Sequence, residues 1–230
     1  MSPVLNDAGA SVLTWSVLEV RGADAETFLQ GQLSQDLRAL DDAGAWTLVL
    51  APDSVVVATG FITPTEDGFD VVIARELADA ALVRLRRFLL RAACTLTLRE
   101  SDHGPFMTLD EQIDANWPGP DELAGSLTPH TFGRTFVAST ISFDKGCFTG
   151  QELVGRLDAR GSSVPWRLVR VSGPSREAID EYLKSKGPAG PQGLTSSRVR
   201  EGRVEGLGIA HRTLLSAPSD DAVISVGAVE

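Results

Sequence analysis

The chain has 230 residues, which is long enough to bury a substantial core. Of these, 43% are hydrophobic and 23% are charged, and this composition excludes a fibrous or disordered protein. Its formal net charge of −10 excludes a surface that is basic overall, so we expect no direct nucleic-acid binding. Two cysteines give no disulfide framework, and no cysteine or histidine spacing fits a zinc site, so we expect no metal centre.

The first segments of the chain predict two different elements. Residues 12–20 are rich in β-branched and aromatic side chains, which favours a strand. Residues 22–40 change to a spacing of three and four, which predicts one long helix. The apolar residues of its stripe are Phe28, Leu29, Leu33, Leu37 and Leu40.

The next segments predict three strands, a helix and a further strand. The strands are expected at residues 46–50, 55–59 and 69–74, with turn residues between them. Residues 76–91 carry the strongest helical pattern, and residues 95–100 alternate as a half-buried strand does. Four arginines of the helix are expected on its solvated face, unless they bind an anionic ligand: Arg84, Arg86, Arg87 and Arg91.

The rest of the chain is more broken. Residues 101–135 contain repeated glycines and prolines, so we expect loops with short elements. The patterns beyond the next motif predict strands at 168–172, 204–210 and 222–226, a helix at 176–186 and a long turn at 187–193. Strands and helices mix without a regular βαβ alternation, which indicates the α+β class. No secretory signal and no apolar run of about 20 residues is present, so we expect a cytoplasmic protein with no membrane partner.

The two cysteines have different surroundings in the sequence. Cys94 begins an apolar, alternating segment and is expected to be a small buried side chain. Cys147 lies in KGCFTGQELVGR, between Gly146 and Gly150, with Lys145 two residues before it. A thiol near a lysine and just before a helix N-terminus favours the thiolate, so Cys147 is the candidate reactive or catalytic thiol, although an inert turn cysteine would also fit the spacing.

The motif KGCFTGQE resembles the signature of the YgfZ-type folate-binding proteins, which are relatives of the glycine-cleavage T-protein. Five further segments are similar to this family in the same order: VRGADAETFLQGQLSQDL, RLRRFLLRAACTLTL, LTPHTFG, GRLDARGSSVPWRL and GLTSS. The resemblance implies an α+β fold with a T-protein-like folate-binding body at residues 1–165 and a small β-rich C-terminal domain at residues 166–230.

The resemblance also implies a cofactor, partners and a site. The cofactor is tetrahydrofolate or a derivative, and the partners are folate and iron–sulfur client enzymes or assembly proteins, one of them linked to tRNA modification. The residues expected to bind the cofactor around Cys147 are Lys145, Gly146, Phe148, Gly150, Gln151, Glu152 and Arg156. Glu152 and Arg156, at a spacing of four, are equally explained as a surface pair on a helix.

The chain departs from the family pattern at several positions. Ser54 with Val55, Ala93 and Gln112 stand where family members commonly carry basic residues, and Phe148 replaces a tyrosine. These departures predict weak binding of folate. Two other readings stay open: a folate-free interaction scaffold with the same fold, and an aminomethyltransferase, against which the cysteine in the motif argues.

Overall fold

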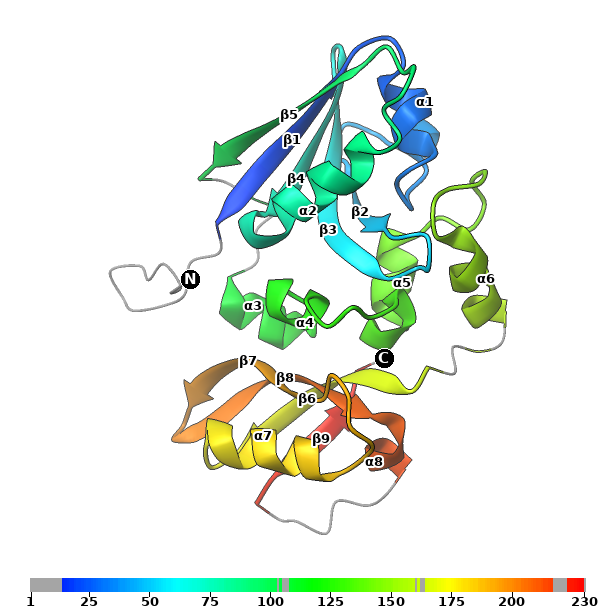
Figure 1. Cartoon of the computed structure of the whole chain (residues 1–230). Coiled ribbons are helices and arrows are strands. Elements are labelled where there is room, and N and C mark those ends of the chain that lie inside the picture. Colours follow the sequence, from blue (N-terminus) through cyan, green and yellow to red (C-terminus); the bar gives the residue numbers. More distant parts are fainter. Residues whose placement is uncertain are drawn as a thin grey trace. The chain divides into compact units, whose positions relative to one another are not determined.

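A computed structural model of the chain describes residues 14–102, 104, 108–159, 161, 164–216 and 223–229. Within these residues, helices pack on two antiparallel sheets, which confirms the α+β class (Figure 1). The chain divides into two compact units. The first joins Met1–Phe106 to Val137–Arg156, and the second joins Met107–Phe136 to Leu157–Glu230.

The first unit contains a five-stranded sheet in the order β2-β3-β4-β1-β5. Its strands are β1 (Trp15–Arg21), β2 (Ala45–Leu50), β3 (Val56–Thr65), β4 (Gly68–Ala74) and β5 (Thr95–Ser101). Its helices are α1 (Ala25–Gln30), the 3-10 turn η1 (Leu37–Ala39) and α2 (Arg75–Arg86), while α5 (Arg134–Thr140) and α6 (Gln151–Ala159) cross its limits in the sequence. The strands expected from the sequence are present, and β3 extends six residues beyond its expected end at Thr59.

One apolar core joins the sheet to α1 and α2. Leu18 and Val20 of β1 are fully buried, as are Ile62 of β3 and Ile73 of β4. The helices add further buried side chains to the same core: Ala25, Phe28 and Leu29 from α1, and Ala78, Ala81, Leu82 and Leu85 from α2. Burial of this apolar area is the main stabilising term for the unit.

The expected long helix at residues 22–40 is wrong, because α1 ends at Gln30. Leu33 instead forms a bridge with Val49 of β2, and the Ser34 N–H donates to the Leu48 carbonyl (3.2 Å). Pairing with the edge strand β2 therefore replaces the next helical turn. The apolar stripe still packs in the core, because its residues Phe28, Leu29, Leu33 and Leu37 are all buried.

The expected position of the α2 arginines needs one correction. Arg86 and Arg87 are exposed, as is Arg91 in the turn beyond the helix. Arg84 is only 7% exposed, and its Nε donates to the Leu50 carbonyl at the end of β2 (3.0 Å). The sequence pattern could not distinguish Arg84 from its neighbours, because this contact joins segments 34 residues apart.

The second unit contains a four-stranded sheet in the order β7-β8-β6-β9. Its strands are β6 (Trp166–Gly173), β7 (Gly193–Arg200), β8 (Arg203–His211) and β9 (Ser225–Ala228). Its helical elements are α3 (Leu109–Ala115), α4 (Pro120–Leu123), η2 (Pro129–Phe132), α7 (Arg176–Ser185) and α8 (Arg212–Ser216). The first residue of the strand expected at 222–226 lies outside the described residues, and β7 and α8 were not predicted.

Helical segments cover both faces of this sheet. Val169 and Val171 of β6 pack with Ile179 and Leu183 of α7 on one face. Arg170, between the two valines, points to the opposite face and donates to the Ile113 carbonyl of α3 (2.8 Å). Residues 107–136 thus belong to the second unit. The compact units therefore differ from the domain limit expected between residues 165 and 166.

None of the helices in the described part of the chain combines the length and apolar character that crossing a lipid bilayer requires.

Candidate functional site

The cysteine motif forms a turn in the first unit, followed by α6. The helix begins at Gln151, directly after Gly150, as the glycine-rich spacing predicted. Cys147 is exposed, as is Gly146, whereas Lys145 and Phe148 on either side are buried. The turn therefore presents the thiol to solvent between two anchored side chains.

Lys145 holds the turn from inside the protein. Its Nζ donates to the carbonyl oxygens of Leu33 (2.7 Å) and Gln35 (2.8 Å) and lies 5.2 Å from the centre of the Phe148 ring. Burial lowers the pKa of Lys145 to about 8, while the negative charge of Asp36 acts in the opposite direction. Two of the three ammonium N–H groups are thus used to tie the segment after α1 to the motif.

Gly150 fixes the motif against the turn between β2 and β3. Its φ is +83°, and a Cβ at this position would lie 2.7 Å from the Ala51 carbonyl oxygen and 2.9 Å from the Leu50 Cβ. Ser54 is fully buried, and its hydroxyl donates to the Gly150 carbonyl. Glycine is therefore required at position 150 both by its backbone angle and by the lack of space.

A third connection runs from Thr149 to the end of α1. The Thr149 N–H donates to the Gly31 carbonyl (3.1 Å), and its hydroxyl donates to Gln32 Oε1 (3.3 Å). The motif is thus held at three residues, Lys145, Thr149 and Gly150, by segments more than 90 residues away in the sequence. A backbone held in this way keeps the exposed Cys147 in a defined position.

The other expected site residues have different surroundings. Gly146 has no heavy atom within 4 Å of a built Cβ, so its surroundings are open. Gln151 is half-buried at the start of α6, and its N–H donates to the Phe148 carbonyl (3.2 Å). Glu152 and Arg156 form an exposed ion pair on α6 (2.5 Å), as their spacing allowed. Such a pair contributes at most a few tenths of a kcal/mol.

Cys94 is half-buried and packs against the core of the first unit. Burial raises the pKa of its thiol, and the charge of Asp24 raises it further.

Iodoacetamide is expected to alkylate Cys147 at least about fivefold faster than Cys94 at pH 7.5, because the reactive species is an accessible thiolate. Timed labelling of the folded protein, followed by mass spectrometry of the two cysteine peptides, measures both rates in one sample. Labelling in denaturant is the control, since the two rates should then converge. Faster labelling of Cys94 in the folded protein would contradict the described exposure.

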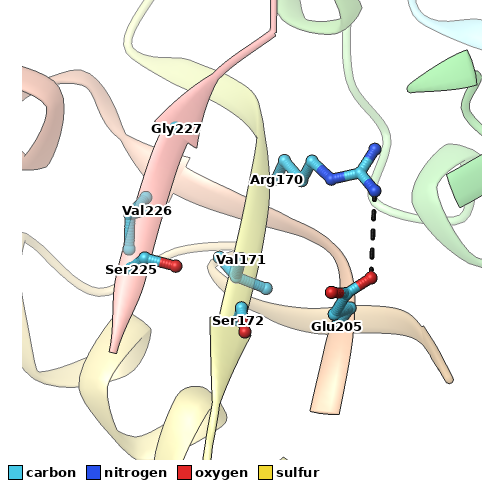
Figure 2. A pocket seen from close by; sticks show the side chains of 7 residues that line it. All are labelled: Arg170, Val171, Ser172, Glu205, Ser225, Val226 and Gly227. Atoms are coloured by element: carbon cyan, nitrogen blue, oxygen red, sulfur yellow. Dashed lines mark ion pairs between the residues drawn. The ribbon is translucent and has the colours of Figure 1, made fainter. Parts of the chain in front are cut away.

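The described part of the chain has cavities whose linings lie outside the motif. One of about 300 Å³ opens on the sheet of the second unit, where Arg170 forms an ion pair with Glu205 (3.9 Å) (Figure 2). Its other lining residues are Val171, Ser172, Ser225, Val226 and Gly227. A cavity of about 240 Å³ in the first unit is lined by Gly22, Ala23, Ala25, Glu26, Pro64, Thr65, Asp67, Gly68 and Phe69. Neither lining includes a residue of the motif.

The charges beside the larger cavity satisfy one another. Asp114 of α3 accepts hydrogen bonds from Arg170 (3.3 Å) and from Arg198. The bond from Arg198 is the main cause that lowers the pKa of Asp114 to about 2. Arg198 also lies 3.4 Å from Glu205. This network joins α3 to β6, β7 and β8, so its role is to hold the second unit together.

Sequence reasoning missed the residues that position the motif. The Ser54 hydroxyl and the carbonyls of Leu33 and Gln35 carry no local signal, because their partners are distant in the sequence. The arginine-rich helix was noticed, but not its buried member Arg84. A buried charge on an otherwise regular helix cannot be identified from spacing alone.

Comparisons with known proteins identify the fold of this chain. No family model matches the chain. An uncharacterized protein of Haemophilus influenzae is 25% identical over 195 residues, which cover 66% of this chain and 69% of that protein. The crystal structure of the glycine cleavage system aminomethyltransferase T from Bartonella henselae has a TM-score of 0.59 at 13% identity, covering 86% of this chain and 76% of that chain. The chain therefore has a T-protein-like fold, which confirms the architecture expected from its motifs.

Proposed function

We propose that the chain is a folate-binding accessory protein that holds tetrahydrofolate or a derivative beside Cys147. The observation that carries the proposal is the exposed thiol in a turn whose backbone is fixed at Lys145, Thr149 and Gly150. A T-protein-like fold supports it, since the motif resembles that of folate-binding relatives of this fold. The finer proposal is a role in iron–sulfur cluster assembly or repair, linked to tRNA modification.

The residues around Cys147 have separate proposed roles. The open space at Gly146 lets a flat pterin ring approach the backbone closely. Gly150 and Gln151 are proposed to contact the folate where the turn meets α6. The buried side chains of Phe148 and Lys145 support the turn from inside the protein. Glu152 and Arg156 remain in water and supply hydrogen-bonding groups at the rim.

An iron–sulfur cluster is normally held by several thiolates, so Cys147 alone is not proposed to hold one. We propose instead that the thiol acts on partner proteins that carry or assemble the cluster. The partners are accordingly iron–sulfur client enzymes or assembly proteins, and the proposed location is the cytoplasm. No direct contact with nucleic acid is proposed.

The main alternative is a folate-free interaction scaffold. It is favoured by one specific observation: the Lys145 ammonium, the basic group of the signature, is engaged with two backbone carbonyls. An aminomethyltransferase is the remaining alternative, and it rests on the likeness of fold.

Calorimetric titration with tetrahydrofolate separates the proposal from the scaffold reading. We expect binding with a Kd on the order of 100 μM or weaker. Neutral residues stand at several positions where family members carry basic ones, and each charge-assisted hydrogen bond lost in this way costs about 1.5–3 kcal/mol. Titration with a purine nucleoside is the control for non-specific stacking. Absence of heat at millimolar tetrahydrofolate would favour the scaffold.

A further inference from the structure

Arg84 of α2 carries a buried charge that the described residues do not balance. Its side chain is 7% exposed, and its Nε donates to the Leu50 carbonyl (3.0 Å). Both terminal nitrogens, Nη1 and Nη2, are buried and have no hydrogen-bond partner in the part of the chain that the structure describes. The two nitrogens together present four N–H donors that are not used.

No carboxylate among the described residues forms an ion pair with Arg84. Burial lowers the pKa of its guanidinium, and the positive charge of Arg87 lowers it further. Proteins normally compensate a buried guanidinium with a carboxylate or phosphate, because an isolated buried charge is strongly unfavourable. The centre of the Phe88 ring lies 4.4 Å from Arg84 Cζ, so this ring covers one face of the guanidinium without bonding to its edge.

Arg84 shares a contact segment with the cysteine motif. The Leu50 carbonyl accepts its Nε–H, and Leu50 with Ala51 forms the wall against which Gly150 packs. The guanidinium and the motif turn therefore adjoin the same end of β2 within the first unit. Phe88, whose ring covers one face of the guanidinium, is itself 45% exposed, so one neighbour of Arg84 borders solvent.

We propose that Arg84 binds a carboxylate of the ligand that occupies the motif site, which for the proposed folate is the carboxylate of its glutamate tail. The planar fork of the guanidinium matches a carboxylate in a bidentate arrangement. A carboxylate would supply both the missing charge and the missing acceptors. This inference rests on the proposed function for the identity of the ligand, but the anion requirement of Arg84 stands on the contacts of this side chain alone.

The experiment compares two ligands and three variants by calorimetry. Tetrahydrofolate carries the glutamate tail, and tetrahydropteroate has the same rings without it. Arg84→Met is the test variant, Arg84→Lys keeps the charge without the fork, and Arg86→Met is the matched control on the exposed face of the same helix. Each variant is first checked for its unfolding temperature, and Arg84→Lys serves if Arg84→Met does not fold.

We expect the wild type to bind tetrahydrofolate at least about tenfold more tightly than tetrahydropteroate. Arg84→Met should lose this preference and leave tetrahydropteroate binding within about twofold of wild type, Arg84→Lys should lose part of it, and Arg86→Met should retain it. Equal tetrahydrofolate affinity in Arg84→Met and Arg86→Met would overturn the inference. So would an equal loss of both ligands in the Arg84 variants, which would indicate a structural role.

A second measurement separates failure of the inference from failure of the folate proposal. If the wild type binds neither pterin, the folate proposal fails, and thermal unfolding with citrate then tests Arg84, using sodium chloride at equal ionic strength as the reference. A citrate-dependent rise of at least about 2 °C in wild type and Arg86→Met, but not in Arg84→Met, supports a carboxylate site. The same rise in all three proteins, or none in the wild type, overturns it.

Discussion

Lys145→Met is expected to lower the free energy of unfolding by about 2–4 kcal/mol, because it removes the ammonium that donates to the buried Leu33 carbonyl and to the half-buried Gln35 carbonyl. Two charge-assisted hydrogen bonds are lost, at about 1.5–3 kcal/mol each. Relief of the cost of burying the ammonium offsets part of that loss. Urea unfolding followed by tryptophan fluorescence measures the change.

The control is Arg156→Ala, which removes an exposed cation from the same motif and should change stability by no more than about 0.5 kcal/mol. The effect of Lys145 should also depend on pH. Its pKa is lowered from 10.5 to about 8 in the folded protein, so between these values the unfolded chain binds more protons. The stability of the wild type relative to Lys145→Met should therefore rise as the pH increases from 8 to 10.5. A flat or falling difference would contradict the burial of the ammonium.

Gly150→Ala is expected to cost about 2–5 kcal/mol of stability. The φ of +83° penalises a side chain by about 1–2 kcal/mol, and the added Cβ would overlap the Ala51 carbonyl oxygen and the Leu50 Cβ, for about 1–3 kcal/mol more. Displacement of the turn should also change the labelling rate of Cys147. Urea unfolding and iodoacetamide labelling measure the two effects.

Gly146→Ala is the matched control for this prediction. Gly146 lies four residues earlier in the same motif, does not have a positive φ, and has no heavy atom within 4 Å of a built Cβ. We expect its alanine variant to remain within about 0.5 kcal/mol of wild type. Similar losses for both glycines would show that their backbone requirements are the same, contrary to the geometry.

Local patterns in the sequence predict those elements that are decided by local physics. The alternation in β1 and β5 and the helical stripe of α2 depend on residues a few positions apart, and these elements are present. Likewise, the turn before α6 follows from Gly150. In the segment after β1, Phe28, Leu29, Leu33 and Leu37 of the apolar stripe are buried in the core, although the helix expected there is shorter.

The failures occur where distant segments compete with local preference. The helix expected at residues 22–40 stops because Leu33 and Ser34 pair with β2, and no pattern within the segment signals that pairing. Residues 107–136 join the C-terminal sheet through contacts such as Arg170 to Ile113. The motif was identified from the sequence, but the use of its lysine as an internal anchor depends on carbonyls more than 100 residues away.

Protection of Cys147 by ligand tests most directly the claim that folate lies beside the motif turn. Iodoacetamide labelling is measured with and without tetrahydrofolate, at a concentration where calorimetry shows saturation, and Cys94 serves as the internal reference in the same sample. The account predicts that bound tetrahydrofolate slows labelling of Cys147 at least about fivefold and leaves the rate of Cys94 unchanged. Saturating tetrahydrofolate with an unchanged Cys147 rate would contradict it and place the ligand elsewhere in the protein.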